Sequence, residues 1–380
     1  MRNPFETEER RSFRETVRRF IAREIKPHAD AWDEAGEVPW ELHARIAELG
    51  VFGFGIEERY GGLGFDDAFM RAAFSEEMGR CGATGIPASL GGRSISLGPI
   101  QLLANDEIKT RVLPPVVAGE KGSCLAITEP SGGSDVANLG STARRDGDSY
   151  LINGTKTFIT GGMQADFFVV GARTGGTGLT GISLFLVEAD MPGFTRTPLE
   201  RKMGWWCADQ ATLYFEDCRV PADHLLGAED RGFIAIMENF NLERVALIAQ
   251  SLGMMKDCFE VALTWARERE TFGKRLIEHQ VIRHKFAEMS ARIDAVESTQ
   301  NHICWLINEG EMPIAEICKA KFFATKALEF CASEAMQVLG GAGYLRGNPV
   351  ERIYREVKVM AIGGGSEEIM RDLAARQMGL

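Results

Sequence analysis

The feature that most constrains the fold is a double change in hydrophobic periodicity along the chain. Residues 1–120 place apolar side chains at helical spacing, and residues 233–380 do so again. Residues 121–232 instead hold short apolar runs separated by turn signals, which is the pattern of strands. The sequence therefore predicts an α+β fold with an N-terminal all-helical domain, a small middle β domain and a C-terminal helical bundle.

Individual elements follow from the spacing of apolar residues and from the positions of Gly and Pro. Helices are expected at 6–33, 39–49, 66–80, 94–104, 106–118, 233–268, 282–303, 313–339, 350–361 and 366–378. Strands are expected at 124–127, 149–152, 167–171, 182–187 and 211–215. Turns are expected at 60–64, Gly91-Gly92, Asp146-Gly147 and Asn153-Gly154. The run Gly176-Thr-Gly-Leu-Thr-Gly181 has the letters of a dinucleotide fingerprint, but it leads into a strand and is therefore expected to be a hairpin loop.

Length and composition limit the possible roles of the chain. Its 380 residues suffice for two or three domains, and a formal charge of −11 argues against nucleic acid or an anionic membrane as a partner. No apolar stretch reaches the length of a membrane span, and the N-terminus lacks the features of a signal or transit peptide. The eight cysteines form no Cys-x-x-Cys pair, so we expect no metal site. These features predict a soluble, cytoplasmic protein.

Two neighbouring stretches of the middle domain carry the clearest functional signal. The first, 124–135, runs from an apolar strand into a loop with two glycines and the hydroxyls of Thr128 and Ser134. In the second, Phe158 precedes Thr160 by two residues, and alternate residues of a strand share a face. A flat cofactor could stack on the ring while hydroxyls and loop N–H groups bind its polar edge or a phosphate. An ordinary strand, turn and strand is the alternative for either stretch alone.

The patterns Ile-Thr-Glu-Pro-x-x-Gly-Ser-Asp and Lys-x-Phe-Ile-Thr-Gly, in this order, resemble the flavin-binding middle domain of the acyl-CoA dehydrogenase family. The family also has the same domain order, so the resemblance spans essentially the whole chain. It implies FAD as cofactor, acyl-CoA as substrate and electron-transfer flavoprotein as electron acceptor. By the same resemblance the flavin is held by Leu125, Ile127, Thr128, Ser134, Phe158 and Thr160, and Ser134 also meets the pantetheine or phosphate end of the CoA.

The C-terminal bundle adds two further motifs of this family, Arg-x-x-Phe-Gly and Gln-x-x-Gly-Gly. In the family these motifs reach the pyrophosphate and adenosine of a flavin bound to the neighbouring subunit. The resemblance therefore implies a homotetramer with composite flavin sites. The residues that match are Arg269, Phe272, Gln280, Gln337 and Gly341.

The catalytic base is where this sequence departs from the commonest family pattern. Many members carry a glutamate in a Tyr-Glu-Gly-Thr motif, whereas this chain has Gly363-Gly364-Gly365-Ser366. Isovaleryl-CoA and long-chain acyl-CoA dehydrogenases use instead a glutamate on a bundle helix, just before an arginine. The corresponding residue here is Glu243, and the alternative is that Glu243 is an ordinary solvated helix residue. Beside an apolar acyl chain its pKa would be raised, which makes a carboxylate a stronger base.

The resemblance also suggests roles for residues around this base. The Gly364 N–H would bind the thioester carbonyl and stabilise the developing enolate. Ser366 and Glu368 would contact the flavin, and the acyl-CoA would lie against Ser134, Asn241, Arg244, Gly91 and Gly365.

Two small residues bear on the acyl chain. Pro87 and Gly91 align where medium-chain members have larger polar residues, which predicts a deeper acyl pocket. A helix start and a turn without a nearby ligand is the alternative. Ile86 aligns with an arginine of glutaryl-CoA dehydrogenases, which disfavours a dicarboxylyl substrate.

The sequence thus predicts an FAD-dependent dehydrogenase of a long or branched saturated acyl-CoA. Two alternatives remain at this stage, a flavin oxidase or monooxygenase of the same fold and a non-catalytic acyl-CoA-binding scaffold. The adjacent pair Trp205-Trp206 receives no explanation from the sequence.

Overall fold

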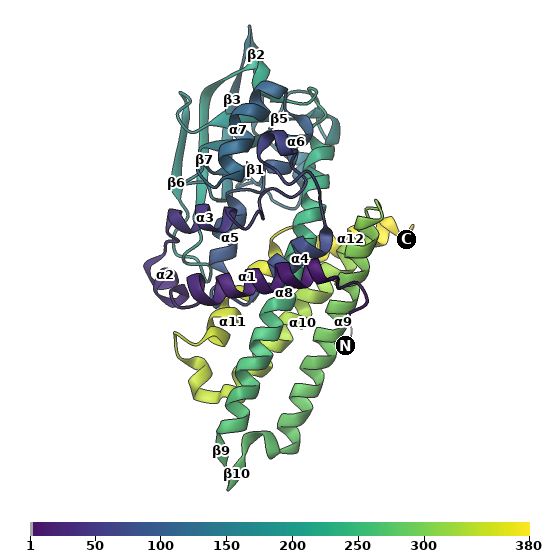
Figure 1. The fold of residues 1–380 in the computed structure, drawn as a ribbon. Coiled ribbons are helices and arrows are strands. Elements are labelled where there is room, and N and C mark those ends of the chain that lie inside the picture. The colour runs from purple at the N-terminus through teal and green to yellow at the C-terminus, as the bar shows by residue number, and fades with distance from the viewer. Residues whose placement is uncertain (1–2) are drawn as a thin grey trace.

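Helices, a β-sheet and a helical bundle follow one another along the chain in the computed structural model, which describes residues 3–380 (Figure 1). The N-terminal helices cover one side of the sheet, and a π-helical turn, Ile21–Ile25, follows the first of them. These helices are α1 (Glu8–Phe20), α2 (Ala29–Ala35), α3 (Trp40–Ala47), α4 (Ala68–Gly79), α5 (Gly85–Gly92), α6 (Leu97–Leu103) and α7 (Asp106–Val117).

The middle segment forms a mixed sheet in the order β6-β7-β3-β2-β4-β5-β8, with β1 paired in parallel to β4. Its central strands are buried on both faces, because Val169 and Leu186 pack against the N-terminal helices while Phe168 and Phe185 face a second core. The strands are β1 (Ser123–Ala126), β2 (Thr142–Asp146), β3 (Ser149–Thr160), β4 (Phe167–Arg173), β5 (Ile182–Glu188), β6 (Phe194–Pro198), β7 (Gln210–Pro221) and β8 (Leu225–Leu226).

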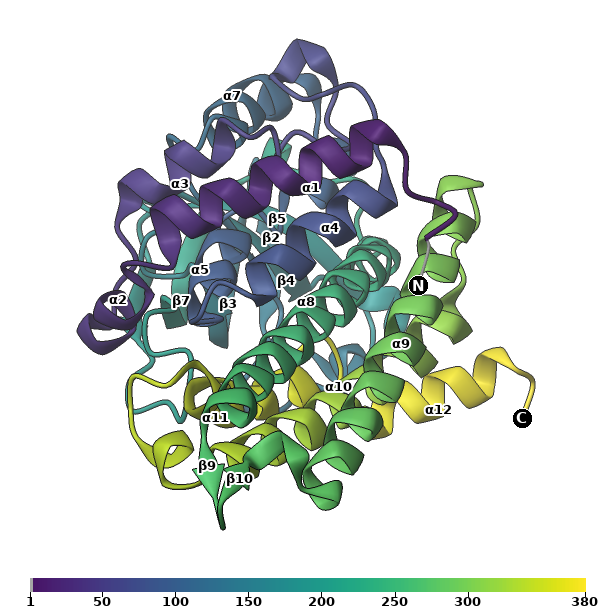
Figure 2. The same cartoon turned by 60° about the horizontal axis from the view of Figure 1, so that its bottom comes forward.

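The C-terminal bundle is built around the long helix α8 (Gly232–Glu268), which packs against α4 of the N-terminal part as well as α10 of the bundle (Figure 2). A small hairpin, β9 (Glu270–Thr271) and β10 (Lys274–Arg275), lies at the end opposite the sheet. The remaining helices are α9 (Gln280–Asn308), α10 (Ile314–Leu339), α11 (Pro349–Ile362) and α12 (Glu367–Gln377). Within residues 3–380, no helix has the length and apolar character needed to cross a membrane.

Most expected elements are present, and the differences have local causes. The expected helix 6–33 is divided by the π-helical turn, and α6 begins three residues later than expected. The turn expected at Gly91-Gly92 is wrong, because both glycines belong to α5. The loop 176–181 joins the antiparallel strands β4 and β5, which confirms a hairpin rather than a dinucleotide-binding turn.

The turn expected at Asn153-Gly154 is also wrong. Gly154 lies inside β3, where the pairing with β7 shifts register, so it marks a β-bulge. Its φ of +149° and the Ser141 side chain, which a Cβ would strike, explain the glycine. The domain limits at 120 and 232 stay predictions, although the structure changes from helix to strand between Val117 and Ser123.

Candidate active site

A cavity of about 1940 Å³ lies where the three parts of the chain meet. Its walls come from α4, α5 and α6, from the loop after β1, from the end of β3, from α8, and from the glycine loop between α11 and α12. The volume exceeds the roughly 1,000 Å³ of large single-ligand pockets, so there is room for more than one ligand.

The residues expected from the two middle-domain motifs all line this cavity. The hydroxyls of Thr128 and Ser134 form no hydrogen bond to residues 3–380, so both can serve a ligand. Thr160 Oγ1 accepts a hydrogen bond from Gln210 Nε2 at 3.3 Å and can still donate its own proton. The complete set is Leu125, Ile127, Thr128, Ser134, Phe158 and Thr160.

Phe158 reaches the cavity by a route that strand alternation does not describe. The pairing of β3 with β7 shifts register between Lys156 and Ile159, and Phe158 has a φ of +58°. An aromatic residue rarely adopts this left-handed conformation, because its Cβ meets the backbone. The ring is 61% exposed, and its face is available for stacking in the cavity.

A buried ion pair fixes the loop that carries Thr128. Lys156 Nζ lies 2.7 Å from Glu129 Oε1 and donates to the Ile127 carbonyl at 3.1 Å. Glu129 also accepts hydrogen bonds from the backbone N–H groups of Gly140 and Ser141 at 2.7 and 2.8 Å. Burial alone would raise the pKa of Glu129, but the Lys156 ammonium and these donors lower it to about 2. The sequence showed these two residues only as parts of motifs.

Glu243 lines the cavity from α8 and is partly buried. It forms no hydrogen bond or ion pair with residues 3–380, which leaves both carboxyl oxygens free toward the cavity. Burial raises the pKa of Glu243 to about 7, although the positive charges of Arg244 and Lys321 act in the opposite direction. A carboxyl with such a pKa can exchange a proton near neutral pH.

Gly364 lies directly across from Glu243. A Cβ built on Gly364 would lie 4.0 Å from Glu243 Oε1 and 2.6 Å from Leu247 Cδ1. The φ of Gly364 is +66°, a conformation that favours glycine. The two positions that the resemblance associates with a catalytic base therefore lie close together at the cavity.

Arg244 holds the glycine loop and does not pair with its neighbour Glu243. Its Nε donates to the Gly364 carbonyl at 2.9 Å, and its Nη1 donates to Asn241 Oδ1 at 2.7 Å. Asn241 itself is buried and does not line the cavity. The structure therefore does not bring its side chain into the expected contact with substrate.

The other expected residues near the base divide into two groups. Gly91, Pro87, Gly365 and Ser366 line the cavity, and Ser366 is also the N-cap of α12. Glu368 does not line the cavity, because it points outward from the first turn of α12 and its side chain is 80% exposed. Ile86 is fully buried and likewise absent from the lining.

The motif residues of the C-terminal bundle lie outside the cavity of their own chain. All are exposed, and they occupy the β9–β10 hairpin region and the ends of α8, α9 and α10 (Figure 1). Phe272 is 98% exposed at the hairpin tip, with a φ of +52°. The five residues are Arg269, Phe272, Gln280, Gln337 and Gly341.

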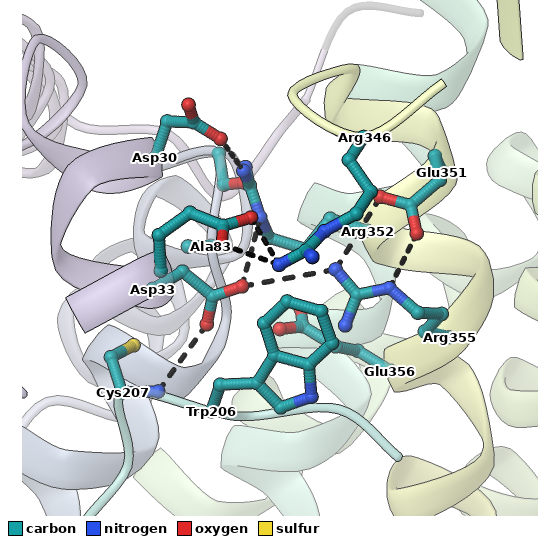
Figure 3. A network of polar contacts seen from close by, with 12 residues as sticks. Asp30, Asp33, Ala83, Trp206, Cys207, Arg346, Glu351, Arg352, Arg355 and Glu356 are labelled. Carbon is teal, nitrogen blue, oxygen red and sulfur yellow. Dashed lines mark hydrogen bonds and ion pairs between the residues drawn. The ribbon is translucent and has the colours of Figure 1, made fainter. Parts of the chain in front are cut away.

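The structure accounts for the tryptophan pair. Trp205 lines the cavity and donates from its indole nitrogen to Thr84 Oγ1 at 2.9 Å. Trp206 lies under the guanidinium groups of Arg346 and Arg355, whose central carbons are 4.4 and 4.0 Å from its ring centre (Figure 3). Only the adjacency of two large aromatics in a loop signalled this network in the sequence.

The same network ties three separate segments together beside the cavity. Asp33 of α2 accepts a hydrogen bond from the Cys207 backbone N–H at 3.3 Å and pairs with Arg352 of α11 at 3.2 Å (Figure 3). Glu356 of α11 accepts from the Trp205 N–H at 3.3 Å. The loop that carries Trp205 is therefore held from both sides.

Comparisons with known proteins agree with this architecture. Models of the N-terminal, middle and C-terminal domains of acyl-CoA dehydrogenases match residues 7–120, 124–218 and 230–379. The chain is 35% identical to an acyl-CoA dehydrogenase of Bacillus subtilis (strain 168), over 98% of both chains. It is 34% identical to the mitochondrial long-chain specific acyl-CoA dehydrogenase of Sus scrofa, over 96% of this chain and 85% of that one.

Among solved structures, the acyl-CoA dehydrogenase of Geobacillus kaustophilus matches with a TM-score of 0.95 and 34% identity, over 100% of both chains. These matches confirm the resemblance and the three-part fold inferred from the sequence. The chain belongs to the acyl-CoA dehydrogenase family, whose members are FAD-dependent oxidoreductases that act on CH–CH groups of acyl-CoA substrates.

Proposed function

We propose that this enzyme dehydrogenates a long or branched saturated acyl-CoA to the trans-2-enoyl-CoA, with Glu243 as the base and electron-transfer flavoprotein as the acceptor. The observation that carries the proposal is the partly buried carboxyl of Glu243, which forms no hydrogen bond or ion pair within residues 3–380 and lies 4.0 Å from a Cβ built on Gly364. A base must lie within reach of the proton that it removes, and its pKa must suit the working pH.

The residues of the cavity fit a flavin. Phe158 offers an exposed ring face, while Thr128 and Ser134 offer hydroxyls without protein partners in residues 3–380. The loop after β1 adds backbone N–H groups suited to a polar ring edge or a phosphate. We assign the flavin to Leu125, Ile127, Thr128, Ser134, Phe158, Thr160 and Ser366. When bound, the flavin supplies a hydride acceptor, which no side chain provides.

The chain's own residues handle the proton and the thioester. Glu243 takes the α-proton of the acyl group, and its oxygens are free to do so because they have no hydrogen-bond or ion-pair partner among residues 3–380. The Gly364 N–H donates to the thioester carbonyl and stabilises the negative charge that forms as the proton leaves. Arg244 keeps this donor in place through the Gly364 carbonyl.

The pH dependence of proton abstraction should report the Glu243 pKa of about 7. A base acts only when it is deprotonated, so the rate of anaerobic flavin bleaching by substrate should rise with pH and level off above about pH 8. Stopped-flow bleaching between about pH 5.5 and pH 9 measures the midpoint. A rate that is already level across this range, as the ordinary glutamate pKa of about 4.3 requires, would contradict the raised pKa of the base.

The preference for long acyl chains is supported by the open space at Gly91. A Cβ there would meet nothing within 4 Å, and Gly91 lines the cavity. The larger side chain of Gly91→Gln should therefore shorten the pocket and lower kcat/KM for long-chain substrates by at least about tenfold. Short-chain substrates measured on the same variant serve as the control, and an equal loss for both classes would mean that Gly91 does not set chain length.

A homotetramer with composite flavin sites is part of the proposal. Phe272 is almost fully exposed in the isolated chain and lies at a hairpin tip, so its ring is accessible to a neighbouring subunit. Arg269, Gln280, Gln337 and Gly341 are exposed as well, and we assign them with Phe272 to the flavin of a neighbouring subunit.

The experiment that tests the proposal is anaerobic titration of the yellow protein with straight, branched and aromatic acyl-CoAs. Bleaching by long or branched chains, followed by reoxidation with electron-transfer flavoprotein, is the expected result. Rapid reoxidation by oxygen with peroxide release would favour a flavin oxidase instead. A protein that purifies without flavin and binds acyl-CoA without turnover would favour a non-catalytic scaffold.

A further inference from the structure

Lys321 is a buried ammonium group beside the candidate base, and the mechanism above gives it no role. It lies on α10 with no exposed surface, at a position of the apolar stripe that Ile317, Ala324 and Leu328 form. An ammonium group removed from water costs several kcal/mol unless it is compensated. Its acceptors here are two backbone carbonyls, Gly365 O at 2.6 Å and Ala361 O at 3.4 Å.

These contacts fix the glycine loop at a carbonyl to which Arg244 does not donate. Arg244 Nε donates to the Gly364 carbonyl at 2.9 Å, and Lys321 Nζ donates to the next carbonyl along the chain. On the other side, the Gly363 N–H donates to the Val359 carbonyl at 2.8 Å. Gly364 and Gly365, with φ of +66° and +104°, would otherwise be free to adopt many conformations.

We propose that Lys321 is a positioning residue for proton abstraction, which holds the 363–366 loop so that the Gly364 N–H stays opposite Glu243 and which favours the carboxylate form of Glu243. The inference rests on the proposed function, because it assumes that Glu243 and Gly364 act on the thioester. Lys321 itself does not touch the substrate, since it is not part of the cavity lining.

The charges around the two groups support the electrostatic part of this role. Burial raises the pKa of Glu243, and the positive charges of Arg244 and Lys321 limit the rise to a value of about 7. Burial and the nearby Arg244 lower the pKa of Lys321 to about 8, while Glu243, Glu367 of α12 and Cys318 of α10 raise it. The mutual attraction of the two groups therefore favours the carboxylate of Glu243 together with the ammonium of Lys321.

Two variants separate the hydrogen bond from the charge. Lys321→Met removes both and keeps a similar side-chain volume, whereas Lys321→Gln keeps a donor without the charge. Both should retain flavin but move the rising limb of the bleaching rate to higher pH, because the Glu243 pKa rises when the neighbouring positive charge is lost. Lys321→Met should also lower the rate of bleaching by at least about tenfold. This loss is smaller than the factor of about 10²–10³ expected when an oxyanion donor is removed completely.

Hydrogen exchange of the 363–366 amides provides a readout that does not depend on turnover. Exchange should be faster in Lys321→Met than in the wild type, because the loop loses one of its fixed points. Lys319→Met is the matched control, since Lys319 lies on the same helix with a side chain 43% exposed, and within residues 3–380 its one ion pair is with Glu316 at 3.2 Å. This control should leave the pH dependence of bleaching, the bleaching rate and the hydrogen exchange of the 363–366 amides unchanged.

The outcomes distinguish the inference from the function on which it rests. A wild-type pH limb and wild-type loop exchange in both Lys321 variants would overturn the positioning role, even if the wild type bleaches as proposed. If Lys321→Met does not fold, the pH dependence of bleaching and the amide exchange of Lys321→Gln test the positioning role. If no acyl-CoA bleaches the wild type, the proposed function fails, while the exchange data still show whether Lys321 holds the loop.

Discussion

Replacing Glu243 with glutamine is expected to lower the rate of flavin bleaching by acyl-CoA by a factor of about 10²–10⁴. The amide has nearly the shape of the carboxyl but cannot accept the α-proton. The site should otherwise persist, because Glu243 forms no hydrogen bond or ion pair within residues 3–380 that the change would break. The measurement is anaerobic stopped-flow bleaching, with the flavin content of each preparation taken from its absorbance.

The matched control is Glu238→Gln on the same helix. Glu238 is exposed and does not line the cavity, so the same chemical change there should leave bleaching intact. Normal bleaching by Glu243→Gln would disprove the assignment of the base. A loss of flavin together with activity would point instead to damage of the cavity.

The second large effect is expected on stability, from Lys156→Met. This change leaves Glu129 buried without its ammonium partner, and breaking a buried pair on one side costs about 3–5 kcal/mol. Because the pair fixes the loop that carries Thr128, flavin retention should fall as well. Thermal unfolding monitored by circular dichroism, together with the flavin-to-protein absorbance ratio, measures both effects.

Arg219→Met provides the comparison for this change. Arg219 pairs with Asp146 at 2.7 Å on the same sheet, but both side chains are about half exposed, so its loss should cost no more than about 1 kcal/mol. Equal losses of stability for Lys156→Met and Arg219→Met would show that burial of the pair does not matter.

The stabilisation that Glu129 contributes in the wild type also has a defined pH range. The pKa of Glu129 is lowered in the folded state, so the stabilisation is present above about pH 4.3 and is lost as the pH falls toward 2.

The features that the sequence predicted well are those set by neighbouring residues. The helical spacing in 282–303 and the start after Pro313 correspond to α9 and α10, because amphipathic periodicity and helix ends are local properties. The motif residues around Thr128 and Glu243 were expected to share a site, and the structure brings them to one cavity. Their roles as ligands and as base stay predictions.

The features that the sequence did not reveal depend on partners far along the chain. The glycine of the bulge at 154 is explained by Ser141, which directly precedes β2, and α5 is helical although it contains three glycines. Asn241 was expected at the substrate, but its position on α8 turns it toward Arg244. The sequence assigns no role to Lys321, although a lysine on the apolar stripe of a helix indicates a buried charge with a specific partner.

The cavity has walls from all three parts of the chain, and this has a thermodynamic consequence. A molecule that binds only the assembled cavity adds its binding free energy to the cohesion of the helical layer, the sheet and the bundle together. Opening any one of the three parts would release the ligand, and the other two parts would then lose the stabilisation that its binding provides. The cofactor of such an enzyme is thus a structural component whose supply governs how cooperatively the whole chain unfolds.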